Sequence, residues 1–304
     1  MEKKSSRILI ILAFIAIYVI WGSTYLFNKI AVTEIPALYL GAVRFSVAGL
    51  LIIIIARFLK LPLSITKKQL RNSIIAGFLF LVYGNGIFVW ALNYLDSGFA
   101  ALLASTQPLA VLILMRLIDH KKVQLKSIIG ITLGLIGMYL LVSQNGITTN
   151  KDSVLGIFMI FTCVFSWSYG SIFVSKADLP KNFFVATGYQ MLTASVILFI
   201  GSLLFNETWQ SPLKWSNSAQ WSVLFLIIFG GIVAFTAFNY LLKNVSTDKV
   251  ASSAYVNPVI ALILGWLVLD ESISKQSLIA AVILLTGVYF ITTRKEKRSV
   301  KSKI

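Results

Sequence analysis

The sequence carries little charge for its length. Only 12% of its 304 residues are charged and 58% are hydrophobic, whereas a soluble domain carries about 25% charged residues. It has one cysteine and one histidine, so it can form no intramolecular disulfide and offers no thiolate cluster or histidine set for a metal. It also lacks a Gly-Lys-Ser/Thr phosphate loop, which argues against ATP-driven transport. The composition excludes an ordinary soluble domain, and we expect neither a metal nor a cofactor.

Long apolar runs fill most of the chain. Runs of about 18 to 23 residues follow one another with short connectors, as transmembrane helices require. The first run follows a basic N-terminus and has no small-residue cleavage site, so we expect it to remain as a span. The sequence predicts an all-α polytopic membrane protein with ten transmembrane helices: Ile8–Phe27, Pro36–Phe58, Leu70–Asn93, Gly98–Met115, Val123–Val142, Val154–Val174, Phe183–Phe205, Trp221–Leu242, Val250–Leu269 and Ser277–Ile291.

The net charge of +16 gathers in alternate connectors. Of the 27 Lys and Arg residues, 22 lie in the termini or in the connectors expected on the same side, four lie in the other connectors, and Arg44 lies within a span. Because cytoplasmic loops are enriched in Lys and Arg, both termini are expected in the cytoplasm of a multi-pass plasma-membrane protein. The expected partners are membrane lipids and a small-molecule substrate, with no nucleic acid. The composition is typical of a bacterial chain, and the sequence leaves open whether it forms a homodimer.

The two halves of the chain resemble each other weakly. A shift of 150 residues aligns Gln107-Pro108 with Asn257-Pro258, and a shift of 146 aligns Arg44 with Gln190. Self-similarity of this kind is typical of duplicated transporters.

This repeat predicts the domain organisation. Because five spans is an odd number, the second half would enter the membrane from the opposite side. We therefore expect two inverted-topology five-helix repeats, residues 1–144 and 145–293, followed by a basic cytoplasmic tail, residues 294–304. Two such halves can form inward-open and outward-open states, which is the basis of alternating access.

Several motifs are distinctive: Trp21–Tyr25, Gly41–Phe45, Gly84–Gly86, Ser97–Pro108 and, in the second half, Ala251–Pro258. In these motifs the chain resembles the drug/metabolite transporter superfamily, specifically its EamA-type exporters, over nearly its whole length. The resemblance implies a central cavity lined by the first, third, fourth, sixth, eighth and ninth spans, and export of amino acids, other metabolites or toxic organic compounds. The chain departs from the family pattern at Asp119-His120-Lys121, where the second half has the acidic Glu271.

Arg44 is the sharpest single feature, because a charged residue about eight positions into a span costs a few kcal/mol unless it is paired or hydrated. Its own span has no acidic residue near it. One interpretation is that Arg44 faces the cavity and binds an anionic group, such as a carboxylate, through its planar fork. The other is that it snorkels outward or binds carbonyl groups to fix the first two helices. The sequence leaves both interpretations open.

Aromatic and hydroxyl residues of the first and sixth spans are expected to face each other through the repeat relation. Apolar walls with a few polar groups suit a small organic solute, although helix packing is the alternative for the hydroxyl residues. Amides at depth can line the cavity or tie helices together. The expected substrate-binding residues are Trp21, Ser23, Thr24, Tyr25, Arg44, Asn85, Gln107, Trp167, Ser168, Tyr169, Asn239 and Asn257. No catalytic residue is expected.

Proline and glycine suggest where helices bend and where they touch. Pro108 and Pro258 are predicted hinges, because a proline in mid-span removes a backbone hydrogen bond; a static kink is the alternative. The series Gly130, Gly134 and Gly137 is predicted to let another helix backbone approach closely.

The sequence as a whole predicts a secondary carrier that moves a small metabolite or drug-like solute by alternating access at a central cavity. The resemblance implies that the direction is export. Two alternatives remain. A nucleotide-sugar or organophosphate exchanger of the same superfamily should show several cavity Lys and Arg residues, whereas the spans offer chiefly Arg44. A membrane-embedded enzyme would need an intramembrane Asp pair, a His cluster or a nucleophile with its base, and we find none. We therefore expect no enzyme.

Overall fold

The computed structural model describes residues 2–95, 100, 103–120, 124–143, 151–269 and 274–293. Every regular element within these ranges is a helix, which confirms the predicted all-α architecture for this part of the chain. Seven helical segments among the described residues are long and apolar enough to cross a membrane: Arg7–Val32, Ala37–Phe58, Lys67–Ala91, Val154–Lys176, Phe183–Leu204, Asn217–Asn244 and Lys275–Thr292. Ser97, Lys121, Glu271 and the tail 294–304, all singled out from the sequence, lie outside the described residues.

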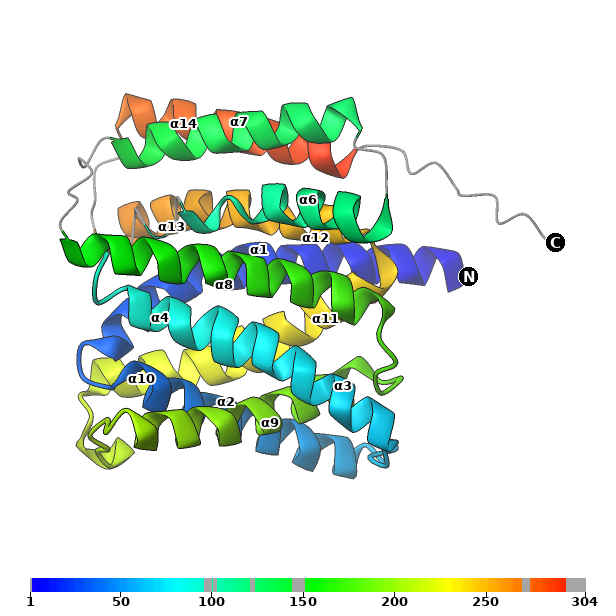
Figure 1. Ribbon diagram of the computed structural model, residues 1–304, viewed down its shortest axis with the longest axis vertical. Helices are drawn as coiled ribbons and strands as arrows, with labels where there is room; N and C mark the ends of the chain where they lie inside the picture. Colours follow the sequence, from blue (N-terminus) through cyan, green and yellow to red (C-terminus); the bar gives the residue numbers. More distant parts are fainter. Residues whose placement is uncertain are drawn as a thin grey trace.

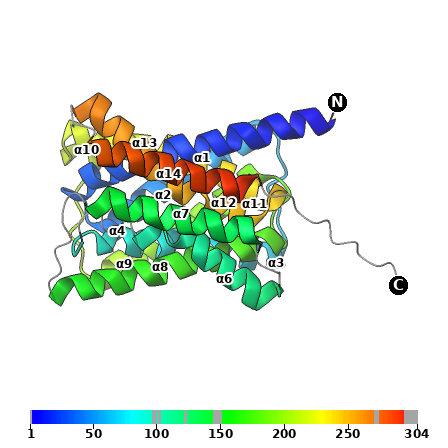
Figure 2. The same ribbon diagram turned by 90° about the horizontal axis from the view of Figure 1, so that it is seen from above.

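The helices lie side by side in stacked layers (Figure 1). In chain order they are α1 (Glu2–Val32), α2 (Ala37–Phe58), α3 (Lys67–Gly77), η1 (Phe78–Ile87), α4 (Phe88–Ala91), α6 (Gln107–Asp119), α7 (Leu125–Val142), α8 (Lys151–Lys176), α9 (Phe183–Leu204), η3 (Pro212–Lys214), α10 (Asn217–Phe225), η4 (Leu226–Phe235), α11 (Thr236–Asn244), α12 (Thr247–Ala251), α13 (Ser253–Leu269) and α14 (Lys275–Thr292). The start of α1 and the end of α14 lie at the same end of the helices in both views (Figures 1 and 2).

Helices of the first half find matching partners in the second half. The two most extensive contacts join α7 to α14 and α2 to α9, which form opposite ends of the stack (Figure 1). Helix α1 contacts α13 and runs along α10, η4 and α11. Helix α8 contacts α6 and runs along α3, η1 and α4. The contacts of α1 in the second half therefore correspond to those of α8 in the first half.

Two predicted spans contain a π-helix that the sequence did not reveal. The ten-residue segments η1 and η4 each continue an α-helix and pass into another. Backbone groups of both segments bind the helix that crosses them: the Leu79 carbonyl accepts from Ser166 Oγ at 2.8 Å, and the Gly230 carbonyl accepts from Trp21 Nε1 at 3.4 Å. π-Helices are rare and frequently occur at functional sites. Their presence in corresponding spans therefore indicates a functional site in the region between α1 and α8.

The two prolines occupy different structural positions. Pro258 lies inside α13, as predicted, and removes a helix hydrogen bond there. Pro108 lies in the first turn of α6, where a backbone N–H would have no partner within the helix. The prediction that Pro108 removes a hydrogen bond within a helix is therefore wrong. Helix α6 begins at Gln107, inside the predicted span, so Pro108 interrupts no helix.

Two carboxylates bind backbone groups at the end of the helices where α2 and α10 begin. Glu207, which follows α9, accepts from the backbone N–H groups of Leu38 and Tyr39 at 3.1 and 2.8 Å. It thereby caps α2, whose own N-cap residue, Pro36, makes no side-chain hydrogen bond. The second carboxylate, Glu34, accepts from the Ser216 hydroxyl and backbone N–H, which hold the pKa of the Glu34 carboxyl below its usual value.

Removing the Glu207 cap should destabilise the fold. Glu207→Ala leaves the buried amides of Leu38 and Tyr39 without their acceptor, so we expect it to lower the free energy of unfolding by about 1–2 kcal/mol. Thermal unfolding of the purified protein in detergent would measure the change. Glu34→Ala is the matched control, because Glu34 is exposed, and should shift the unfolding temperature less. Equal shifts for the two variants would contradict the capping role.

Candidate functional site

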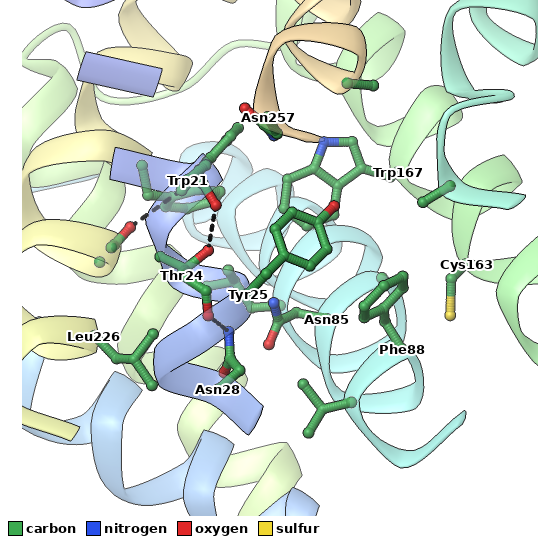
Figure 3. A pocket seen from close by; sticks show the side chains of 18 of the residues that line it. Trp21, Thr24, Tyr25, Asn28, Asn85, Phe88, Cys163, Trp167, Leu226 and Asn257 are labelled. Carbon is green, nitrogen blue, oxygen red and sulfur yellow. Dashed lines mark hydrogen bonds between the residues drawn. The ribbon is translucent and has the colours of Figure 1, made fainter. Parts of the chain in front are cut away.

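A cavity of about 170 Å³ lies between α1, α2, α8, α13 and the two spans that contain π-helices. All six predicted spans that the family resemblance placed at the cavity contribute lining residues, and Arg44 and Phe45 of α2 and Met191 of α9 add to them. Figure 3 shows side chains from both halves around this space. Its location between corresponding helices of the two halves makes it the candidate solute site.

One face of α1 forms a wall of the cavity. Trp21, Thr24, Tyr25 and Asn28 all line it, and their spacing places them on a single helix face. Ser23, also predicted for the site, is buried and donates its hydroxyl to the Val19 carbonyl at 2.8 Å within α1. The i, i+3, i+4, i+7 spacing that begins at Trp21 is a signal in the sequence. It could have predicted that Asn28 lines the cavity and that Ser23 does not.

The opposite wall comes from α8. Trp167 lines the cavity together with Cys163 and Val164. Consecutive helix residues point about 100° apart, so the predicted neighbours of Trp167 face elsewhere: Ser168 is fully buried outside the cavity lining, and Tyr169 is 45% exposed on the outer surface. Of the three predicted residues in α8, the structure brings only Trp167 to the cavity.

Aromatic rings meet across the cavity at Trp21 and Trp167. Their ring centroids lie 5.7 Å apart in an edge-to-face arrangement, and the Phe238 ring lies 4.9 Å from Trp21. The Phe80 ring lies 5.1 Å from Trp167 and 5.4 Å from Phe238. Phe80 and Phe238 are almost completely buried, so the two cavity tryptophans pack against the hydrophobic core through this aromatic cluster.

Arg44 is fixed at the cavity by two asparagines. Its Nη1 donates to Asn28 Oδ1 at 3.0 Å, and its Nη2 donates to Asn85 Oδ1. Asn28 is itself oriented, because its Nδ2 donates to the Thr24 carbonyl at 2.8 Å. The Arg44 side chain is only 5% exposed, and its Nε has no hydrogen-bond partner among the described residues. The predicted outward snorkelling of Arg44 is therefore wrong, because its guanidinium points into the bundle.

Three further polar side chains line the cavity without a hydrogen-bond partner in the described part of the chain. Tyr25, Gln107 and Asn257 line it, and none of their side chains makes a hydrogen bond to the described part of the chain. Asn239, also predicted for the site, lies away from the cavity, where it exchanges hydrogen bonds with Gln190 and donates to Thr187. Within the described ranges no group of His, Cys, Asp and Glu residues could hold a metal ion.

Comparison with known proteins places this chain in a family. The sequence profile of the EamA-like transporter family matches residues 8–143 and again residues 154–293. The chain is 35% identical to the "Uncharacterized inner membrane transporter YedA" of Escherichia coli K12, over 93% of this chain and 90% of that one. It is 23% identical to the "Uncharacterized transporter YoaV" of Bacillus subtilis 168, over 96% and 99%. It is also 24% identical to the "Probable amino-acid metabolite efflux pump" of Escherichia coli K12, over 90% and 91%.

A solved crystal structure has the same fold, with a TM-score of 0.77 at 18% identity over 92% of this chain and 95% of that one. The matching family is one of transporters, and the relatives are named as two transporters and one probable efflux pump, which excludes the alternative of a membrane-embedded enzyme. Together with the apolar helices, they identify a multi-pass protein of the plasma membrane. The chain belongs to the EamA-like transporter family.

Proposed function

We propose that the protein is a secondary carrier that exports small metabolites by alternating access at the cavity between α1 and α8. The observation that carries this proposal is a mostly apolar cavity lined from both halves, with three polar side chains that have no hydrogen-bond partner among the described residues. Such a combination is typical of small-molecule sites. The name of one relative, an amino-acid metabolite efflux pump, supports export of amino acids or their derivatives.

The same proposal includes ten transmembrane helices in two inverted halves, residues 1–144 and 145–293. It is supported by the double match of the family profile, by the corresponding contacts of α1 and α8, and by a π-helix in corresponding spans. The start of α1 and the end of α14 lie at the same end of the helices (Figure 1), as an even number of spans requires. The excess of Lys and Arg in the connectors expected at that end supports a cytoplasmic location for both termini. In this arrangement the two halves would rock about the cavity. Pro108 and Pro258, the predicted hinges, would lie close to the segments that move.

The cavity volume favours a small solute. Sites for drug-sized ligands enclose about 300–1,000 Å³, whereas this cavity encloses about 170 Å³. A nucleotide sugar or organophosphate would need more room and several cationic groups, but Arg44 is the only charged residue among the described lining residues. Amino acids and other small carboxylates are therefore better candidates than drug-like solutes or phosphorylated sugars.

Counterflow in proteoliposomes tests the carrier function whatever ion drives transport, because the solute gradient alone supplies the driving force. Liposomes containing the purified protein are loaded with unlabelled amino acids and small monocarboxylates, and entry of each labelled solute is then followed. We expect saturable entry of at least one solute that depends on the internal unlabelled pool and is absent from protein-free liposomes. If a protein that unfolds cooperatively exchanges none of these solutes, the proposed function is wrong.

A further inference from the structure

Arg44 brings a positive charge into the helix bundle at the wall of the cavity. It is 5% exposed and binds Asn28 of α1 and Asn85 of η1, so its guanidinium lies where three segments meet. A charged group at such depth is costly unless it is compensated. The two asparagine oxygens accept hydrogen bonds but carry no charge, and no carboxylate of the described chain is paired with Arg44. The positive charge of the cavity is therefore not neutralised by the protein residues that the structure describes.

The guanidinium is oriented but not saturated. It has five N–H groups, and the hydrogen bonds to Asn28 and Asn85 engage one on each terminal nitrogen. The amide of Asn28 is held in turn by the Thr24 carbonyl. Because these contacts fix the plane of the guanidinium before a solute arrives, little conformational entropy is lost when an anion binds.

The surroundings of Arg44 indicate what kind of anion fits. The described lining contains no second cation, so a single negative charge suffices for neutrality. Tyr25, Gln107 and Asn257 offer hydroxyl and amide groups for a second polar group of the solute, and the rings of Trp21, Phe88 and Trp167 offer apolar contact. A small carboxylate with a short, partly polar body matches this arrangement, and its planar carboxylate suits the guanidinium fork.

We propose that Arg44 is the carboxylate-binding residue of the carrier, held in place by Asn28 and Asn85, and that the transported solutes are small carboxylates, including zwitterionic amino acids. This inference rests on the proposed carrier function. It assigns Arg44 a role in selecting the solute in addition to its contacts between α1, α2 and η1.

Counterflow of a labelled amino acid, with the corresponding amino-acid amide as competitor, tests the inference. The probe is the amino acid that the wild-type protein exchanges fastest, and its amide lacks only the carboxylate. We expect the unlabelled amino acid to compete and the amide not to. Arg44→Gln should raise the half-saturation concentration by about 10- to 100-fold, the range expected for hydrogen bonds to a charged group. Arg44→Lys, which keeps the charge but loses the fork, should give a smaller increase.

Gln190→Ala is the matched control. Gln190 is the residue that the internal repeat aligns with Arg44, and it is also buried and hydrogen-bonded to an asparagine, but it does not line the cavity. We expect its half-saturation concentration to match that of the wild type. Thermal unfolding in detergent and size-exclusion chromatography show which variants are folded.

The outcomes separate this inference from the proposed function. Exchange of neutral or cationic solutes that survives Arg44→Gln, or equal competition by the amino acid and its amide, would overturn the carboxylate site and leave the carrier intact. An equal loss of affinity in Arg44→Gln and Gln190→Ala would also overturn it, since that would show a general effect of losing a buried polar contact. No exchange of any solute by the folded wild-type protein would overturn both.

Discussion

Gly134→Ala should prevent the protein from reaching a stable fold. A Cβ atom at position 134 would lie 2.2 Å from Cζ and 2.4 Å from Cε2 of the Tyr255 ring. Tyr255 is fully buried in α13 and cannot turn away into open space. Since overpacking of a dense interior by far less than this costs about 1–3 kcal/mol, we expect at least that loss of unfolding free energy. Thermal unfolding in detergent and the monodisperse fraction after size-exclusion chromatography would measure it.

Gly201→Ala is the matched control in another transmembrane helix. A Cβ atom there would meet only Leu38 Cδ1, at 3.6 Å, which is an ordinary contact. Because alanine favours a helix over glycine by about 1 kcal/mol, this variant should be neutral or slightly more stable. Tyr255→Leu removes the ring and should restore part of the stability of Gly134→Ala, so the two changes should not be additive. An unchanged unfolding temperature for Gly134→Ala would show that α7 and α13 can separate easily.

The glycine series shows what sequence pattern can predict about helix packing. Gly130, Gly134 and Gly137 were predicted to allow close approach of another helix, and the structure confirms it: a Cβ atom at Gly130 would lie 2.7 Å from the Gly287 carbonyl oxygen of α14. Small residues four or three positions apart on one helix face are enough for this prediction. The same pattern carries no information about the partner, so neither α14 nor the contact with Tyr255 could be predicted.

Cavity-lining residues could be predicted from the sequence where their depth in a span was enough to place them at the cavity. Trp21, Thr24, Tyr25, Arg44, Asn85, Gln107, Trp167 and Asn257 all line the cavity. The prediction failed where helix rotation decides, because it took consecutive residues such as Trp167, Ser168 and Tyr169 together although they point in different directions. Asn239 failed for another reason. A polar residue at depth can be satisfied by a neighbour, and here Gln190 and Thr187 satisfy it away from the cavity.

The π-helices could not be predicted from local periodicity. Segments η1 and η4 are almost uniformly apolar, so no polar stripe reports how many residues make a turn. Both segments nevertheless form hydrogen bonds to residues of the site. Asn85 of η1 accepts a hydrogen bond from Arg44, and the Gly230 carbonyl of η4 accepts one from Trp21. These two segments thus help to orient the charged and the aromatic parts of the cavity, one from each half of the chain.

Ala104→Trp should abolish transport while the protein stays folded. Ala104 is partly buried and lines the cavity, so a larger side chain can extend into the cavity rather than into a packed interface. The indole would occupy much of the approximately 170 Å³ available and leave no room for a solute beside Trp21 and Trp167. Counterflow of every solute that the wild type exchanges should fall to the level of protein-free liposomes, and thermal unfolding in detergent should change little.

Two further variants make this test specific to the cavity. Ala254→Trp fills the same space from α13, in the other half of the chain, and should also abolish counterflow. Leu50→Trp places an indole on the outer surface of α2, where Leu50 is 53% exposed, and should leave counterflow unchanged. Because the cavity variants act by exclusion, they should abolish exchange of every solute, whereas Arg44→Gln should leave exchange measurable at a higher half-saturation concentration. Normal counterflow by folded Ala104→Trp and Ala254→Trp would show that solutes cross the protein by another path.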